Sequence, residues 1–180
     1  FGGGLGIQYQ NEIPIHQEPF VEMLLNVMSG REQEILVEPG RSIVGNSGVL
    51  LTTVEYLKHG SNKNFIVVDA AMNDLARPSL YNAYHHIDNI ISDDNKSSKR
   101  YDIVGPICET GDFLGRDRKI SVSEGDVLAI HSVGAYGMTM SSNYNSRGRA
   151  SEILIDDTHA HIIRKRESVE ELFSNEQMAP

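Results

Sequence analysis

The sequence has a single cysteine, Cys108, among its 180 residues. One cysteine cannot form a disulfide within the chain, so folding needs no oxidising compartment and we expect a cytoplasmic protein. The sequence also lacks any apolar run near the roughly 20 residues that a membrane-spanning helix requires. We therefore expect neither a membrane span nor a signal peptide.

Positive charge is scarce as well. Lys and Arg number 16 against 25 Asp and Glu, which gives a formal net charge of −9. Nucleic-acid binding depends on clustered basic side chains that release counterions, so a nucleic-acid partner is not expected. With 39% hydrophobic and 23% charged residues, the composition is that of a globular protein, and the length suits one domain or a domain with part of another.

The chain starts with Phe1-Gly2-Gly3-Gly4-Leu5-Gly6 and has no initiator methionine, as expected for a portion of a longer protein. After this glycine-rich loop, apolar residues recur at helical spacing over residues 19–28. This spacing predicts an amphipathic helix with Pro19 at its first position and its end near Gly30. A short apolar run at residues 34–37 predicts a buried strand. Loop, helix, strand and loop in this order indicate a piece of an α/β architecture.

From about residue 45 the pattern changes to short runs rich in Val, Ile and Tyr, which turn residues separate. Such runs predict strands, and the first two flank a hairpin turn at residues 59–62. The predicted strands cover residues 49–57, 64–68, 101–108, 126–133, 151–155 and 159–163, and the last two pair around a turn at Asp156-Asp157. They indicate a mainly β module.

Two further segments complete the predicted organisation. Residues 92–100 are polar and lack periodicity, which predicts a solvated loop. Ser168 and Glu171 have the spacing of a capping box, which predicts a short helix through Phe173. We divide the chain into residues 1–45, the end of an α/β unit, and residues 46–180, a β domain.

Two motifs in the first part could bind an anion. Glycines at positions 2, 3 and 4 leave backbone N–H groups free to converge on a phosphate, although a tight turn explains them equally well. Glu38-Pro39-Gly40-Arg41 places a carboxylate and a guanidinium around a rigid turn at the end of a predicted strand, where α/β proteins bind ligands. An ion pair that stiffens the turn is the alternative.

Three motifs in the second part could take part in chemistry. Arg77 and Tyr81 lie four residues apart, on one face if the segment is helical. Cys108 and Glu109 place a thiol beside an acid where a predicted strand gives way to a loop. Tyr136 lies between small residues just after another strand, with its hydroxyl open to a ligand. Surface pairing, a buried cysteine and core packing are the respective alternatives.

The histidines are candidate metal ligands, but their spacing does not favour a metal site. The seven histidines include the adjacent pair His85-His86, and His159 and His161 on one strand face. No Cys or carboxylate stands beside them at the spacing of metal ligands. We therefore predict no metal site and expect these histidines to be solvated or packed.

The motifs combine into a recognisable series. Gly2-Gly3-Gly4-Leu5-Gly6-Ile7, Glu38-Pro39-Gly40-Arg41-Ser42, the segment 72–81, Cys108-Glu109-Thr110-Gly111-Asp112 and Gly134-Ala135-Tyr136-Gly137 occur in this order in diaminopimelate decarboxylases. The sequence resembles these enzymes over most of residues 1–155. The resemblance implies a pyridoxal-phosphate enzyme that joins an alanine-racemase-like (β/α)₈ barrel to a C-terminal β domain. Residues 1–45 would then be the end of the barrel.

The resemblance also implies which residues hold the cofactor. Gly2, Gly3 and Gly4 would bind the phosphate of pyridoxal phosphate, with Pro39, Gly40 and Arg41 approaching it. Glu38 would pair with the protonated pyridine nitrogen. Tyr136 would contact the phosphate, and both Arg41 and Tyr136 would also reach the substrate.

The implied substrate is meso-2,6-diaminopimelate, and the implied products are L-lysine and CO₂. Arg77 and Tyr81 would hold the distal carboxylate, and Glu109 would take the distal ammonium group. Cys108 would be the acid that reprotonates the α-carbon. In this family Cys108 and Glu109 enter the active site of the opposite subunit, so the resemblance implies a homodimer.

The family binds its cofactor covalently through a lysine in the N-terminal part of the barrel. All six lysines of this sequence lie in polar or turn-like contexts, unlike a desolvated amine at a strand end. We therefore expect these 180 residues alone to lack decarboxylase activity. A decarboxylase of arginine or carboxynorspermidine is the alternative within the enzyme class. A catalytically silent homologue that binds a partner is the alternative outside it.

Overall fold

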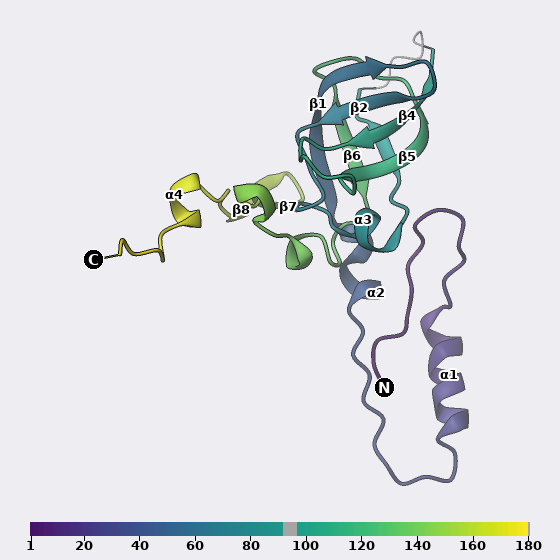
Figure 1. Ribbon diagram of the computed structural model, residues 1–180. Coiled ribbons are helices and arrows are strands. Elements are labelled where there is room, and N and C mark those ends of the chain that lie inside the picture. Colours follow the sequence, from purple (N-terminus) through teal and green to yellow (C-terminus); the bar gives the residue numbers. More distant parts are fainter. Residues whose placement is uncertain (92–96, 180) are drawn as a thin grey trace.

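Six strands form one mixed sheet at the centre of the computed structural model, which describes residues 1–91 and 97–179. The strand order is β3-β6-β1-β2-β4-β5, and neighbours are antiparallel except for the parallel pair β2 and β4. Figure 1 shows the sheet curling around its own core. The bounds are β1 Val49–His59, β2 Asn64–Val68, β3 Ile87–Asn89, β4 Lys99–Val104, β5 Phe113–Ile120 and β6 Val127–His131.

The sheet is nearly closed because its two edge strands meet. Gly115 of β5 lies so close to Ile87 of β3 that a Cβ atom on the glycine would be 3.0 Å from the isoleucine Cδ1. The interior is filled by aliphatic side chains that are fully buried. They include Ile66, Leu75, Ile103, Leu114, Leu128 and Ile130. The predicted mainly β module is confirmed.

The hairpin predicted around residues 59–62 is confirmed. Strands β1 and β2 pair in antiparallel register, with His59 opposite Asn64, and the N–H of Gly60 donates to the carbonyl oxygen of Lys63 at 3.1 Å. The predicted strands near residues 101, 126, 151 and 159 are also present, within a few residues of their expected ends. Short runs of branched and aromatic residues between turn residues therefore predicted these strands correctly.

Strands β3 and β5 were not predicted. Strand β5 carries four charged residues in a row, Arg116 to Lys119, which hide its alternation. The structure explains two of them by aromatic packing. The guanidinium carbon of Arg116 lies 3.6 Å from the ring centroid of Phe113, and that of Arg118 lies 3.7 Å from the ring centroid of Tyr84. Arg116 is exposed and Arg118 is half-buried, and each lies over an aromatic ring that covers part of its side chain.

The predicted N-terminal helix exists as α1, Gln17–Val27, but begins two residues earlier than expected. Pro19 is its third residue, which is tolerated because the first N–H groups of a helix have no intrahelical acceptor. Gly30 ends the turn after the helix with a left-handed φ of 77°. Only Leu24 of this helix is buried, although the sequence predicted a wider apolar face.

The strand predicted at residues 34–37 is wrong for this structure. These residues form no ladder, and most of their side chains are exposed. A strand needs a hydrogen-bonded neighbour, and the segment beside it, residues 1–6, makes only one backbone bond to it, from the Phe1 amino group to the Leu36 carbonyl oxygen at 3.0 Å. Apolar composition alone therefore predicted pairing that these residues do not make.

The remaining elements lie at the borders of the sheet. Helix α2 is Arg41–Val44, continued by a 3₁₀ turn at Gly45–Ser47, and α3 is Arg77–Tyr81. Strands β7, Glu152–Asp156, and β8, His159–Arg164, pair as the predicted hairpin. Short 3₁₀ turns occupy Met138–Met140 and Tyr144–Ser146. None of the described helices is long and apolar enough to cross a membrane.

The predicted capping box is confirmed in α4, Val169–Leu172. The Ser168 hydroxyl accepts from the Glu171 N–H at 3.3 Å, and the Glu171 carboxylate accepts from the Ser168 N–H at 2.7 Å. The loop predicted at residues 92–100 lies largely outside the described residues, since residues 92–96 are not described and β4 begins at Lys99.

Figure 1 also shows how the N-terminal part is arranged. Residues 1–40, with α1, extend away from the sheet and return to it through α2, which leads into β1. The hairpin of β7 and β8 and helix α4 project on another side of the sheet. The division of the chain at residue 45 stays a prediction.

Candidate active site

The loop after β6 packs tightly against the end of α2. A Cβ atom on Gly134 would collide with the carbonyl oxygen of Val44, and one on Gly48 would lie 2.5 Å from the Cα atom of Gly134. Two hydrogen bonds join the same segments, from the Gly134 N–H to the Gly45 carbonyl oxygen at 3.1 Å and from the Val133 N–H to the Gly48 carbonyl oxygen at 3.0 Å. Only glycine permits this approach, which fixes α2 against the loop.

This contact brings Tyr136 between two arginines. The ring centroid of Tyr136 lies 5.3 Å from the guanidinium carbon of Arg41 and 6.0 Å from that of Arg77. Tyr136 has a left-handed φ of 66°, a conformation that costs a non-glycine residue about 1–2 kcal/mol. Such strain persists where the surrounding structure fixes it, and it is common at functional sites. The structure thus unites three residues that the sequence singled out separately.

Arg77 is a nearly buried cation, with 8% of its surface exposed. Its guanidinium carbon lies 4.8 Å from the ring centroid of Tyr9, and its Nη1 atom lies 3.1 Å from Nε2 of His85. No carboxylate of the described residues lies within ion-pair distance of it. A buried charge without a counter-ion is costly, so this guanidinium is suited to binding an anion.

His85 is fully buried beneath Arg77. Burial lowers the pKa of its imidazole, and the nearby charges of Arg77 and Arg118 lower it further, against a hydrogen bond to the carbonyl oxygen of His131 that raises it. The imidazole is therefore neutral at pH 7. It is a partner for Arg77 that leaves the positive charge of the guanidinium uncancelled.

The glycine loop and the Glu38–Arg41 motif also meet. A Cβ atom on Gly3 would lie 2.7 Å from the carbonyl oxygen of Glu38, and Gly4 has a left-handed φ of 79°. The backbone N–H groups of residues 2–4 donate to no described residue. Within the described residues, Glu38 and Arg41 form no ion pair with each other, so the alternative of a stiffened turn is not what the structure shows.

These groups fit a phosphate-bearing aromatic cofactor. Free N–H groups on a chain without Cβ atoms and a cation without a carboxylate partner suit a phosphate, and the free Glu38 carboxylate suits a protonated ring nitrogen. The Tyr9 hydroxyl is buried and has no hydrogen-bond partner in the described part of the chain. An unpaired buried hydroxyl beside Arg77 is a further sign of a polar group that this chain does not supply.

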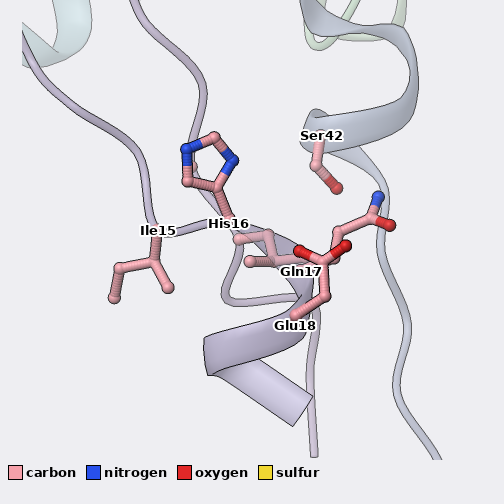
Figure 2. Close-up of a pocket in the computed structure, with 7 residues that line it drawn as sticks. Ile15, His16, Gln17, Glu18 and Ser42 are labelled. Carbon is pink, nitrogen blue, oxygen red and sulfur yellow. The ribbon is translucent and has the colours of Figure 1, made fainter. Parts of the chain in front are cut away.

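A separate cavity of about 320 Å³ lies between the glycine loop and the starts of α1 and α2. Figure 2 shows Ser42 of α2 facing Gln17 and Glu18 across it, with His16 at the side. Its lining includes the Glu18 carboxylate and no Lys or Arg, so it is poorly suited to a phosphate. The free N–H groups of residues 2–4 are better suited to one.

The loop that carries Cys108 and Glu109 is shaped by Asp112. This carboxylate, 4% exposed, accepts from the N–H groups of Met72 and Ile107, each at 2.7 Å. Burial raises the pKa of Asp112, and these two hydrogen bonds oppose the rise. The loop is also tied to α3, because the Ser79 hydroxyl donates to the Gly111 carbonyl oxygen at 2.5 Å.

At the tip of this loop both predicted functional groups are exposed. The hydroxyl of Tyr144 donates to Glu109 Oε2 at 3.2 Å, and this bond raises the pKa of Tyr144. The Cys108 thiol is free and lines a surface cavity of about 830 Å³ that also includes Arg147 and Arg166. No hydrogen bond or ion pair of the described residues joins this loop tip to the Arg77 guanidinium.

The structure therefore places the predicted site residues in two groups. The first holds the glycine loop, the Glu38–Arg41 motif, Arg77 and Tyr136, and the second holds Cys108 and Glu109. Tyr81 belongs to α3 with Arg77, but it is 65% exposed.

Four residues with clear roles in the site were missed by the sequence interpretation. They are Tyr9, His85, Asp112 and Tyr144. For Asp112 a signal existed, because it closes the Cys108–Asp112 motif. For His85 there was none, since its contact with Arg77 depends on a chain reversal at Asn82, which has a left-handed φ of 51°.

No group of three or more His, Cys, Asp or Glu side chains in the described residues could hold a metal ion. The described residues instead bring together free backbone N–H groups, a guanidinium without a carboxylate partner and an aromatic ring at the border of the sheet. Such a combination is typical of a domain that binds an anionic cofactor. Comparison with known proteins agrees: residues 20–134 match the family model of the pyridoxal-dependent decarboxylase C-terminal sheet domain, and the chain belongs to that family.

The names of similar proteins are more specific than the name of the family. The chain is 52% identical over 179 residues to the diaminopimelate decarboxylase of Pseudomonas aeruginosa, covering 99% of this chain and 43% of that protein. A crystal structure of the Helicobacter pylori diaminopimelate decarboxylase with L-lysine matches with a TM-score of 0.89 and 44% identity, over 97% of this chain and 43% of that one. A structure from Aquifex aeolicus matches with a TM-score of 0.91 and 46% identity, over the same shares of the two chains. The chain thus spans less than half the length of these relatives.

The close approach at Gly134 leads to a first prediction. We expect Gly134→Ala to lower the melting temperature by about 5 °C or more, because the new methyl group overpacks the contact with Val44 at a cost of about 2–3 kcal/mol. Gly111→Ala is the matched control, since its Cβ atom would meet nothing nearer than 3.9 Å. Differential scanning calorimetry measures both. Equal melting temperatures for the two variants would contradict the importance of the contact.

Proposed function

We propose that the protein containing this chain decarboxylates meso-2,6-diaminopimelate to L-lysine and CO₂ with pyridoxal phosphate as its cofactor. The observation that carries this proposal is Arg77, a nearly buried guanidinium without a carboxylate partner in the described residues. A substrate with a carboxylate at its far end would complete this site. The names of the relatives at about 50% identity support the same substrate.

The cofactor would be held by the first group of residues. When bound, pyridoxal phosphate supplies a sink for the electron pair that is released when CO₂ leaves. The free N–H groups of residues 2–4, with Pro39 and Gly40 beside them, would bind its phosphate, and Arg41 and Tyr136 would approach the same group. Glu38 would keep the proton on the pyridine nitrogen, because its carboxylate has no other described partner.

The far end of the substrate would be recognised by charge. Arg77 would bind the distal carboxylate with its planar fork, and Tyr81 would add its hydroxyl. Glu109 would bind the distal ammonium group, with the Tyr144 hydroxyl holding one of its carboxylate oxygens. Holding this end fixes the orientation of the carbon that loses CO₂, and correct orientation contributes much of the rate enhancement.

Cys108 would donate the proton that replaces CO₂ on the α-carbon. Cys108 and Glu109 are exposed at a loop tip, and no described hydrogen bond joins them to the Arg77 group. Their exposure supports a homodimer in which the loop of one subunit completes the site of the other. A cytoplasmic location, expected from the single cysteine, belongs to the same proposal.

The described lysines do not resemble a lysine that binds the cofactor. All five lysines of the described residues are exposed. A lysine that binds the cofactor needs a desolvated amine. We therefore assign the attachment lysine to the part of the relatives that this chain does not match.

The substrate assignment can be tested in the full-length enzyme. Arg77→Met and Glu109→Gln should each lower kcat/KM for diaminopimelate by about 10- to 100-fold, because each removes a charged hydrogen bond of about 1.5–3 kcal/mol. Arg31→Met, which removes an exposed arginine outside the site, is the control and should leave kcat/KM unchanged. Steady-state CO₂ release measures the effect. Faster turnover of L-arginine or carboxynorspermidine than of diaminopimelate would contradict the assignment.

The shared active site can be tested by subunit mixing. Cys108→Ala and Arg77→Met each damage both sites of a homodimer, but a hybrid dimer has one site free of both substitutions. Co-expression of the two variants should restore up to about a quarter of wild-type activity, since half the dimers are hybrids and half their sites are intact. A mixture no more active than the better variant alone would show that each subunit acts with its own Cys108.

A further inference from the structure

We propose that His85 is a positioning residue that orients the Arg77 guanidinium and thereby sets the preference of the enzyme for ligands with a distal carboxylate. This inference rests on the proposed function. It goes beyond it because His85 would touch neither substrate nor cofactor. It would act only through the arginine that it holds.

The hydrogen bonds of His85 determine its tautomer. Its Nδ1 atom lies 2.9 Å from the carbonyl oxygen of His131, and its Nε2 atom lies 3.1 Å from Nη1 of Arg77. A carbonyl oxygen only accepts and a guanidinium only donates, so Nδ1 carries the proton and Nε2 accepts from the arginine. Both ring nitrogens are satisfied, and the imidazole is neutral.

The neighbours of this pair form a rigid frame. The Tyr9 ring meets the His85 ring edge to face, with centroids 5.3 Å apart, and lies beneath the Arg77 guanidinium at 4.8 Å. The carbonyl oxygen of His131 belongs to the end of β6, which leads directly into the loop of Tyr136. His85 therefore couples Arg77 to the strand that positions Tyr136.

Neutrality is the property that makes His85 useful here. The charged groups that face it are Arg77 and Arg118, and burial also disfavours its protonated form. A carboxylate at this position would orient Arg77 equally well but would pair with it and occupy its charge. A neutral acceptor fixes one N–H group and leaves the others of the guanidinium for a ligand.

Two ligands separate this role from a general structural one. L-Lysine and cadaverine share a five-carbon chain and two amines, and they differ only in the carboxylate that Arg77 would bind. Loss of the arginine's orientation weakens L-lysine alone. Damage to the fold or to the cofactor site weakens both ligands.

The experiment measures Kd for L-lysine and for cadaverine by calorimetry on the full-length, cofactor-loaded enzyme. His85→Met keeps the volume but removes the acceptor, so L-lysine should bind about tenfold or more weakly while cadaverine changes by less than about twofold. His85→Gln keeps an acceptor for Arg77 and a donor for His131, so it should hold L-lysine within about threefold of wild type. His86→Met, at the exposed neighbouring position, is the control and should change neither Kd.

Several outcomes would overturn the proposal. They are an unchanged Kd for L-lysine in His85→Met, equal weakening of both ligands, or a His85→Gln variant that loses L-lysine as His85→Met does. If His85→Met does not fold, His85→Gln decides alone, because loss of its preference for L-lysine overturns the role. A wild-type enzyme without preference for L-lysine over cadaverine would instead contradict the proposed function.

Discussion

The site depends on a cation that the fold buries among neutral groups. Desolvating a guanidinium costs several kcal/mol, and the two aromatic rings and the imidazole around Arg77 return only part of that cost. The rest can come from an anionic ligand. The described residues provide no carboxylate for this purpose, so the charge stays available to a ligand.

The backbone contact at Gly134 makes this arrangement possible. It holds α2 against the loop after β6, which brings Arg41 and Arg77 to the same tyrosine ring although they are 36 positions apart in the sequence. The strands beneath the loop are part of the buried core, so the ring has a firm base. A flexible N-terminal segment would not hold Arg41 at a fixed distance from the Tyr136 ring. The tight packing of glycine on backbone fixes this position.

The elements that were predicted correctly are those that depend on local sequence patterns. The hairpin of β1 and β2, the β7–β8 pair and the capping box of α4 follow from short apolar runs, turn residues and spacing, and all were correct. Strand β5 was missed because its run of charged residues is typical of a loop. Arg116 and Arg118 lie over aromatic rings, a contact that the sequence does not reveal. Residues 34–37 were misread as a strand because pairing depends on a neighbour. His85 was missed because its contact with Arg77 is created by a chain reversal, which no periodicity encodes.

In the proposed homodimer, one chain supplies only part of each active site. Arg77 and Tyr136 form one part, and the loop with Cys108 and Glu109 forms the other. A crystal structure of the full-length enzyme with L-lysine tests this account most directly. We expect the lysine carboxylate within about 3 Å of the Arg77 guanidinium, with the His85 contact kept and Glu109 of the other subunit at the α-amino group. A carboxylate bound elsewhere, with Arg77 touching only protein, would contradict the account.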